Sequence, residues 1–101
     1  MITRIVKLTF KEENLQDFLD FFETIKYVVN EFPGCRGMKL YQDVKHPNVI
    51  LTYSHWRSEE DLNYYRDSEA FGQIWPGIKP WFKDKPEAWS VKAYFDGFEN
   101  P

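Results

Sequence analysis

The sequence contains a single cysteine, Cys35, among its 101 residues. One thiol cannot form a disulfide within the chain, so a reducing compartment is the default expectation. Residues 1–4 lack the charged start and following apolar run of a secretory signal peptide. No apolar stretch approaches the ~20 residues that a membrane-spanning helix needs. We therefore expect a cytoplasmic protein without a membrane partner.

Neither sign of charge dominates, since 13 Lys and Arg stand against 16 Asp and Glu. The basic residues are spread along the chain, so no basic stripe is present to neutralise the phosphates of a nucleic acid. The five glycines are isolated, which excludes a glycine-rich phosphate loop. His46 and His55 have no constellation of Cys or carboxylate residues around them, so the sequence predicts no metal site. No serine stands in the context of a nucleophile elbow.

Aromatic residues are abundant. Nine Phe, six Tyr and four Trp make up 19% of the chain. Each such side chain can bury roughly 150–250 Å², which is more than a small domain of four strands and two helices usually absorbs. The excess predicts a second buried surface, either a subunit interface or an aromatic-lined pocket. A core that simply uses large residues is the alternative interpretation.

Apolar residues in the first third of the chain recur with two different periods. Residues 2–10 alternate between apolar and polar side chains, which predicts a strand. Residues 15–32 place their apolar side chains on one stripe of a helix. Asn14 is expected to cap this helix with its side chain. Pro33 and Gly34 are expected to end it.

The rest of the chain adds two strands, a second helical region and a last strand. Residues 38–43 and 49–57 are predicted to form strands joined by a short turn. A helical region follows, with start signals at Ser58 and again at Ser68. The residues expected to break this region into pieces are Pro76, Gly77 and Pro80. Residues 89–95 alternate again and predict a last strand.

The order βαββαβ is the split arrangement of ferredoxin-like domains. It predicts one α+β domain with an antiparallel sheet over residues 1–95 and a C-terminal tail over residues 96–101. Both helices then cover one face of the sheet, and the other face needs a partner. The apolar side chains expected on that open face are Ile5, Leu51, Tyr53 and Tyr94. Because an exposed apolar patch marks an interface, we expect a homodimer through the sheets.

Two local patterns indicate a family. One is Phe32-Pro33-Gly34-Cys35 at the end of the first predicted helix, and the other is Trp56-x-Ser58-x-Glu60 followed by Tyr65-x-x-Ser68-x-x-Phe71. On this order of elements, the chain resembles the antibiotic-biosynthesis-monooxygenase family of dimeric α+β barrels over residues 2–95. The resemblance implies that two sheets pair into a barrel and that each subunit keeps a pocket between its own sheet and helices.

The family includes proteins that oxygenate phenols or quinols without metal or flavin, proteins that degrade heme and proteins that act on small signalling molecules. The resemblance therefore implies a cofactor-independent monooxygenase that acts on a small aromatic or quinol-type ligand. A non-catalytic binding or sensing module of the same fold is the alternative. A purely structural dimer, with its aromatic residues consumed by packing, is a third interpretation.

The heme-degrading branch carries an Asn on the first strand, a Trp on the second helix and a His ten residues later. Aligned through Ser68 and Phe71, these places fall on Val6, Tyr65 and Trp75. Without the His, no axial nitrogen is available to iron at that place. The resemblance therefore implies no heme, and we expect no cofactor.

Tyr65, His55 and Trp75 are the first candidate site residues. The Tyr65 phenol could donate a hydrogen bond to a substrate oxygen, although its ordinary pKa near 10 makes it a poor base. His55 titrates near neutrality and is the best general base on chemistry alone. However, neighbours on a strand point to opposite faces, so His55 cannot share a pocket with Trp56, and an interfacial role is favoured. Trp75 could stack on a planar ligand. A place in the core is the alternative for both Tyr65 and Trp75.

The remaining candidates for substrate binding are Trp56, Val6, Arg4 and Phe71. Trp56 is also expected to anchor the core. Arg4 interrupts an otherwise apolar face of the first strand. It could meet an anionic or phenolic ligand under the helices. Alternatively it reaches water near the strand end, which is the interpretation that the sequence favours.

Overall fold

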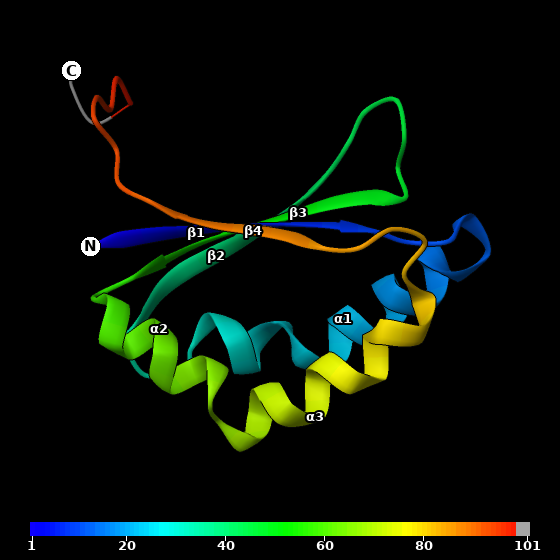
Figure 1. The fold of residues 1–101 in the computed structure, drawn as a ribbon, viewed down its shortest axis with the longest axis horizontal. Helices are drawn as coiled ribbons and strands as arrows, with labels where there is room; N and C mark the ends of the chain where they lie inside the picture. The colour runs from blue at the N-terminus through cyan, green and yellow to red at the C-terminus, as the bar shows by residue number, and fades with distance from the viewer. Residues whose placement is uncertain (99–101) are drawn as a thin grey trace.

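The chain forms a four-stranded antiparallel sheet that three helices cover on one face (Figure 1). The computed structural model describes residues 1–98. In chain order, the elements are β1 (Ile2–Thr9), α1 (Leu15–Asn30), β2 (Cys35–Gln42), β3 (Val49–Trp56), α2 (Glu59–Arg66), α3 (Glu69–Ile78) and β4 (Glu87–Val91). The strand order is β2-β3-β1-β4. The predicted ferredoxin-like α+β fold is confirmed, with the second helical region divided into α2 and α3.

Buried side chains pack at both ends of the β1–β3 pair. Leu8 lies opposite Ile50 at one end of this pair, and Ile2 lies opposite Trp56 at the other. At the first end, the buried core cluster consists of Leu8, Phe10, Phe18, Ile50 and Ile78. At the second end, Trp56 is 1% exposed. The middle of the sheet, between these two ends, carries the candidate site.

The start of α1 differs from the predicted one. Asn14 does not cap the helix with its side chain, because residues 12–14 form a short 3-10 turn that leads directly into α1. The Asn14 amide instead donates a hydrogen bond to the Asp17 carboxylate, 2.9 Å away. The helix ends at Asn30, before Phe32, which Pro33 was expected to keep out of the helix. The side-chain oxygen of Asn30 accepts a hydrogen bond from the backbone N–H of Met38 at 3.0 Å, which ties this helix end to β2.

Two strands also differ from their predicted ranges. β2 begins at Cys35 rather than at residue 38, because an irregularity between Cys35 and Met38, where Gly37 has a φ of +122°, lets the pairing with β3 continue past it. β4 ends at Val91 rather than at residue 95. Its last pair joins Val91 to Thr3, one residue from the start of β1, so the chain beyond has no strand residues left to pair with.

The register of β4 changes the composition of the uncovered face. The side chains predicted correctly for this face are Ile5, Leu51 and Tyr53. Tyr94 was predicted wrongly, since it follows the end of β4 and is fully exposed. Instead, Trp89 lies opposite Ile5 and Val91 opposite Thr3. The turn between β2 and β3 and the segment after β4 both rise above this face (Figure 1).

Both predicted starts in the second helical region are confirmed. The hydroxyl of Ser58 accepts a hydrogen bond from the backbone N–H of Asp61 at 3.2 Å and caps α2. The hydroxyl of Ser68 accepts one from the N–H of Phe71 at 3.2 Å and caps α3. Each cap satisfies one of the free N–H groups at a helix start.

The predicted break at Pro76 and Gly77 is wrong, because α3 continues to Ile78. Proline in a helix removes one hydrogen-bond donor. Here that loss is offset by packing, since Ile78 is 4% exposed and belongs to the core cluster. The helical geometry tightens only afterwards, in a 3-10 turn over Lys79–Trp81 that contains Pro80.

Within residues 1–98, no helix is long and apolar enough to cross a membrane. The predicted tail over residues 96–101 falls partly outside the described residues, which end at 98. The domain boundary at residue 95 stays a prediction.

Candidate functional site

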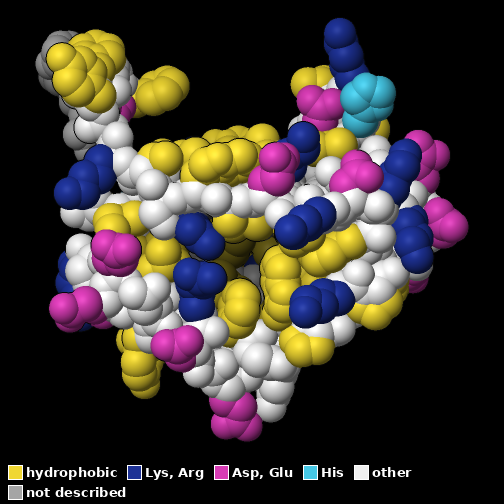
Figure 2. Space-filling model, viewed as in Figure 1, with side chains coloured by type: hydrophobic (Ala, Val, Ile, Leu, Met, Phe, Trp, Pro, Cys, Tyr) yellow, Lys and Arg dark blue, Asp and Glu magenta, His cyan; other side chains and the backbone are white. Residues whose placement is uncertain are grey.

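A cavity of about 380 Å³ lies between the middle of the sheet and the helices. This volume falls within the range of small-molecule sites. Figure 2 shows its mouth as a hollow with hydrophobic side chains around it and Lys or Arg side chains on both sides. The sheet contributes Val6 from β1 and Thr52 from β3, while α1, α2 and α3 contribute the opposite wall. Trp56 from one packed end and Leu8 and Ile78 from the other also line the cavity.

One wall of the cavity is a continuous series of aromatic rings. Tyr65 stacks on Trp56 with centroids 5.0 Å apart and an angle of 28° between the planes. The edge of Tyr65 also meets Phe71 at 5.3 Å. Phe71 in turn stacks on Trp75 at 5.6 Å and 13°. The rings therefore run from β3 through α2 to α3, and these four residues line the cavity.

Tyr65 and Trp75 reach the cavity from two helices rather than from one. The sequence interpretation placed them on one side of a single helical region. In the structure, α2 ends at Arg66 and α3 starts at Glu69, so helical spacing does not relate the two rings. Phe71 lies between them and connects their rings.

The Tyr65 hydroxyl is a free polar group on this wall. Among residues 1–98, no hydrogen bond to it is formed, and no side-chain oxygen is fully buried without a partner, so this oxygen keeps some accessible surface on a residue that lines the cavity. Burial of the ring, together with the nearby Cys35, raises the pKa of Tyr65 to about 12. The phenol is therefore neutral at pH 7 and can donate a hydrogen bond but cannot act as a base.

Arg4 and Arg66 are the charged residues that line the cavity, and no acidic residue lines it among residues 1–98. Arg4 donates a hydrogen bond from Nη1 to the hydroxyl of Ser90 on β4, 3.0 Å away. Burial, and next the positive charge of Arg66, lower the pKa of Arg4 from its ordinary value. Within the described residues neither guanidinium forms a salt bridge.

His55 lies on the other face of the sheet. Its Nδ1 is 3.2 Å from the hydroxyl of Thr3, and its ring meets the edge of Tyr53 at 5.0 Å. The structure therefore does not bring His55 together with Tyr65. The predicted residues that do line the cavity are Arg4, Val6, Trp56, Tyr65, Phe71 and Trp75.

Sequence reasoning missed Arg66. It stands in the last turn of α2, where a cation is common because it complements the helix dipole. No pattern in the sequence separates this cation from the other exposed ones. Its place beside Arg4 follows from how α2 lies across the sheet.

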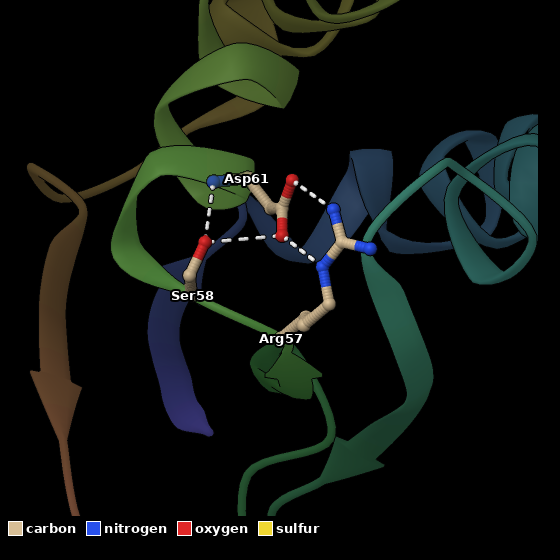
Figure 3. A network of polar contacts seen from close by, with 3 residues as sticks. All are labelled: Arg57, Ser58 and Asp61. Atoms are coloured by element: carbon tan, nitrogen blue, oxygen red, sulfur yellow. Dashed lines mark hydrogen bonds and ion pairs between the residues drawn. The ribbon is translucent and has the colours of Figure 1, made fainter.

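A small polar network fixes the start of α2 (Figure 3). Arg57 follows the last residue of β3 and donates two hydrogen bonds to the Asp61 carboxylate, at 2.8 and 3.0 Å. The hydroxyl of Ser58 donates to the same carboxylate at 3.0 Å. Such bidentate pairs are directional, so they hold the helix against the strand end. The network thereby places Tyr65, one turn further along α2, over Trp56.

Within residues 1–98, no group of three or more His, Cys, Asp and Glu side chains is arranged to hold a metal ion.

Comparison with known proteins identifies relatives of this fold. The model of the antibiotic biosynthesis monooxygenase family matches residues 1–75. Among curated proteins, no sequence matches at a significant level. A solved antibiotic biosynthesis monooxygenase is 19% identical, with a TM-score of 0.86 over 92% of this chain and 98% of that chain.

Two further solved structures have similar shapes. A conserved protein from Methanosarcina mazei Go1 is 22% identical, with a TM-score of 0.83 over 91% of this chain and 92% of that chain. The protein Rv0793 from Mycobacterium tuberculosis is 11% identical, with a TM-score of 0.84 over 95% of this chain and 97% of that chain. At these identities, the likeness to solved structures establishes the fold alone.

Proposed function

Since this chain belongs to the antibiotic biosynthesis monooxygenase family, we propose that it is a cofactor-independent monooxygenase acting on a small aromatic or quinol-type substrate. The observation that carries the proposal is the cavity of about 380 Å³, whose aromatic wall presents an accessible phenol. A core filled by packing alone would leave no such space. The cavity therefore counts against the purely structural interpretation.

A quinol supplies both electrons that the reaction needs. The deprotonated quinol transfers one electron to dioxygen, and the resulting radical and superoxide combine into a hydroperoxide at a ring carbon. The O–O bond then breaks with loss of water and leaves a new carbonyl oxygen. For hydroquinone, one quinol and one dioxygen give one hydroxyquinone and one water, so the atoms and electrons balance without an external reductant.

The side chains of the cavity have distinct proposed roles. Phe71 and Trp75 stack on the substrate ring, which fixes its orientation and excludes water. The Tyr65 hydroxyl donates a hydrogen bond to a substrate oxygen, where negative charge develops as the proton leaves. Because no His, Asp or Glu lines the cavity among residues 1–98, the substrate proton passes to solvent. The proposal thus requires a substrate that is itself acidic enough to ionise in the site.

A non-catalytic binding or sensing module is the second candidate function. The absence of a carboxylate or imidazole from the cavity lining of the described residues favours it, because the site then has no general base. The two functions share the aromatic wall and differ in whether bound quinol reacts with dioxygen.

Oxygen consumption distinguishes the two functions. Purified protein is mixed with hydroquinone and naphthohydroquinone, and uptake is compared with the rate without protein. Dioxygen of a heavy isotope identifies oxygenation, because the label then appears in the quinone product rather than only in peroxide. We expect labelled product with wild type, slower formation with Tyr65→Phe, and wild-type rates with Tyr64→Phe, whose ring is exposed and outside the cavity. Uptake equal to the protein-free rate would reject the monooxygenase.

We also propose that the chain forms a homodimer through the uncovered face of its sheet. Trp89 and Val91 are 46% and 39% exposed on this face, and apolar area of this kind favours a protein interface. The single Cys35, half-buried and unpaired, supports the expectation of a cytoplasmic location, which stays a prediction.

A further inference from the structure

The charges that line the cavity are unbalanced. Arg4 and Arg66 both contribute to its surface, and the described part of the lining holds no Asp or Glu. The salt bridges of residues 1–98 lie elsewhere, and neither guanidinium takes part in one. Arginine in a partly buried place is normally paired with a carboxylate or phosphate. Arg4 is half-buried and Arg66 is exposed, so Arg4 is the one whose burial calls for an anionic partner. Both line the same apolar space, and without a protein anion there that role falls to a ligand.

Arg4 is held in position before any ligand binds. Its strand register places it opposite Ser90 of β4, and its Nη1 donates to the Ser90 hydroxyl at 3.0 Å. That bond uses one of the five N–H donors of a guanidinium, so the others remain available. Preorganised donors of this kind bind an anion without the cost of ordering a long side chain.

Desolvation adds a second argument. Arg4 is partly buried, and the positive charge of Arg66 acts on it. Both effects disfavour the charged form of Arg4. The opposite charge of a bound anion offsets both contributions, because it pairs with each guanidinium and screens one from the other.

We propose that the ligand of this cavity is a planar aromatic acid, whose anionic group binds Arg4 and Arg66 while its ring stacks on Phe71 and Trp75. The two parts of such a ligand would meet different elements of the lining. The two cations come from β1 and the end of α2, and the stacked rings come from α3. The inference rests on ligand binding in the cavity that the proposed function uses. It does not depend on whether the bound ligand is oxygenated.

Paired probes isolate the contribution of the anionic group. Gentisate is a hydroquinone that carries one carboxylate, and methyl gentisate has the same ring with the charge removed. Hydroxynaphthoate and its methyl ester form the corresponding two-ring pair. Binding of all four is measured by titration calorimetry under argon, so that no oxygen reaction contributes. We expect wild type to bind the acid of at least one pair about tenfold more tightly than its ester.

Variants then assign the preference to the two arginines. Arg4→Gln combined with Arg66→Gln is expected to bring acid and ester to within about twofold of each other while the ester's affinity stays near wild type. Lys45→Gln, which removes an exposed cation in the turn between β2 and β3, should leave the preference intact. Because loss of the Arg4–Ser90 bond could loosen β4, Arg66→Gln alone serves as the second variant, and thermal melting verifies that each protein is folded.

Equal affinity for acid and ester in wild type would overturn the inference, and so would a preference that survives in the double variant. Failure of both acids to bind at millimolar concentration would also overturn it. A preference for the acid without oxygen uptake would support the inference and reject the proposed oxygenation. Uptake with the esters, and no preference for the acids, would reject the inference and support oxygenation.

Discussion

Gly34 lies directly against Asp61, so that a Cβ atom at Gly34 would come within 2.5 Å of the Asp61 Cβ. The backbone of Gly34 has a φ of +88°, a conformation that residues with side chains rarely adopt. Its carbonyl accepts a hydrogen bond from the N–H of Arg57 at 2.9 Å. The turn after α1 therefore approaches the start of α2 closely, and glycine permits that approach.

Gly34→Ala is expected to lower the free energy of unfolding by about 2–3 kcal/mol, because it combines backbone strain with a steric clash. Urea denaturation measures the change. Gly72→Ala is the control, since Gly72 lies in α3 with no atom within 4 Å of its Cβ position. That substitution should raise stability by about 0.5–1 kcal/mol. A neutral result at Gly34 would contradict the close approach.

The Asp61 carboxylate should make stability depend on pH in acid. The hydrogen bonds from Arg57 are the largest cause that lowers the pKa of Asp61 below its ordinary value of 3.8. A lowered pKa gives stability that is present above 3.8 and is lost as pH falls through the folded value. Asp61→Asn should therefore be less stable than wild type at neutral pH, and the difference should shrink in acid.

Urea denaturation of both proteins across the acid range measures this difference. Arg57→Gln removes the other partner, so the losses in Asp61→Asn and Arg57→Gln should overlap in the double variant rather than add. A gap between wild type and Asp61→Asn that stays constant down to the lowest pH would contradict the prediction.

Tyr65→Phe separates a free hydroxyl from a structural one. At neutral pH the stability should change by less than about 0.5 kcal/mol, because the hydroxyl has no partner among residues 1–98 to lose. At high pH the wild type should lose stability relative to the variant. The pKa of Tyr65 is about 12 when folded, against an ordinary value of 10.0, so ionisation favours the unfolded chain between these values.

The extra loss in wild type should reach about 2 kcal/mol near the upper end of that range. Chemical denaturation at pH 8 and at high pH measures it, with Tyr64→Phe as the control in which the wild-type behaviour is retained. A large loss of stability in Tyr65→Phe at neutral pH would indicate an internally bonded hydroxyl instead.

The proposed dimer is tested through Trp89. Light scattering on wild type at micromolar concentration should give about twice the mass of one chain. Trp89→Lys places a charge in the proposed interface and should shift the equilibrium toward monomer. Tyr27→Lys alters an exposed aromatic residue on α1, outside the sheet, and should remain dimeric. A monomeric wild type would show that the uncovered face has another role.

The parts of the fold that the sequence predicted depend on neighbours within one element. Alternation fixed β1 and β3, and the hydroxyls of Ser58 and Ser68 marked both helix starts. The end of β4 could not be predicted, since it depends on where its partner β1 begins. The continuity of α3 through Pro76 likewise depends on core packing at Ile78, which local propensity does not contain.

For the candidate site, too, only the features that depend on neighbouring residues could be predicted from the sequence. Strand alternation was sufficient to separate Trp56 from His55, and the structure places them on opposite faces. The resemblance implied a pocket between sheet and helices, but its size could not be predicted from the residues, because an unfilled volume depends on how three helices pack on one sheet. The place of Arg66 in the lining could not be predicted either, since it depends on the contact of α2 with the strand end.

The edge strand β4 contributes to the cavity lining and has few contacts that hold it in place. It pairs with β1 alone over five residue pairs, all of its residues are exposed, and Ala88 lines the cavity. Strands with few buried contacts open locally at a small fraction of the global free energy of unfolding. In a single chain, fraying of β4 should therefore set the residence time of a bound molecule, and the proposed dimer, which would bury Trp89 and Val91, should lengthen that time.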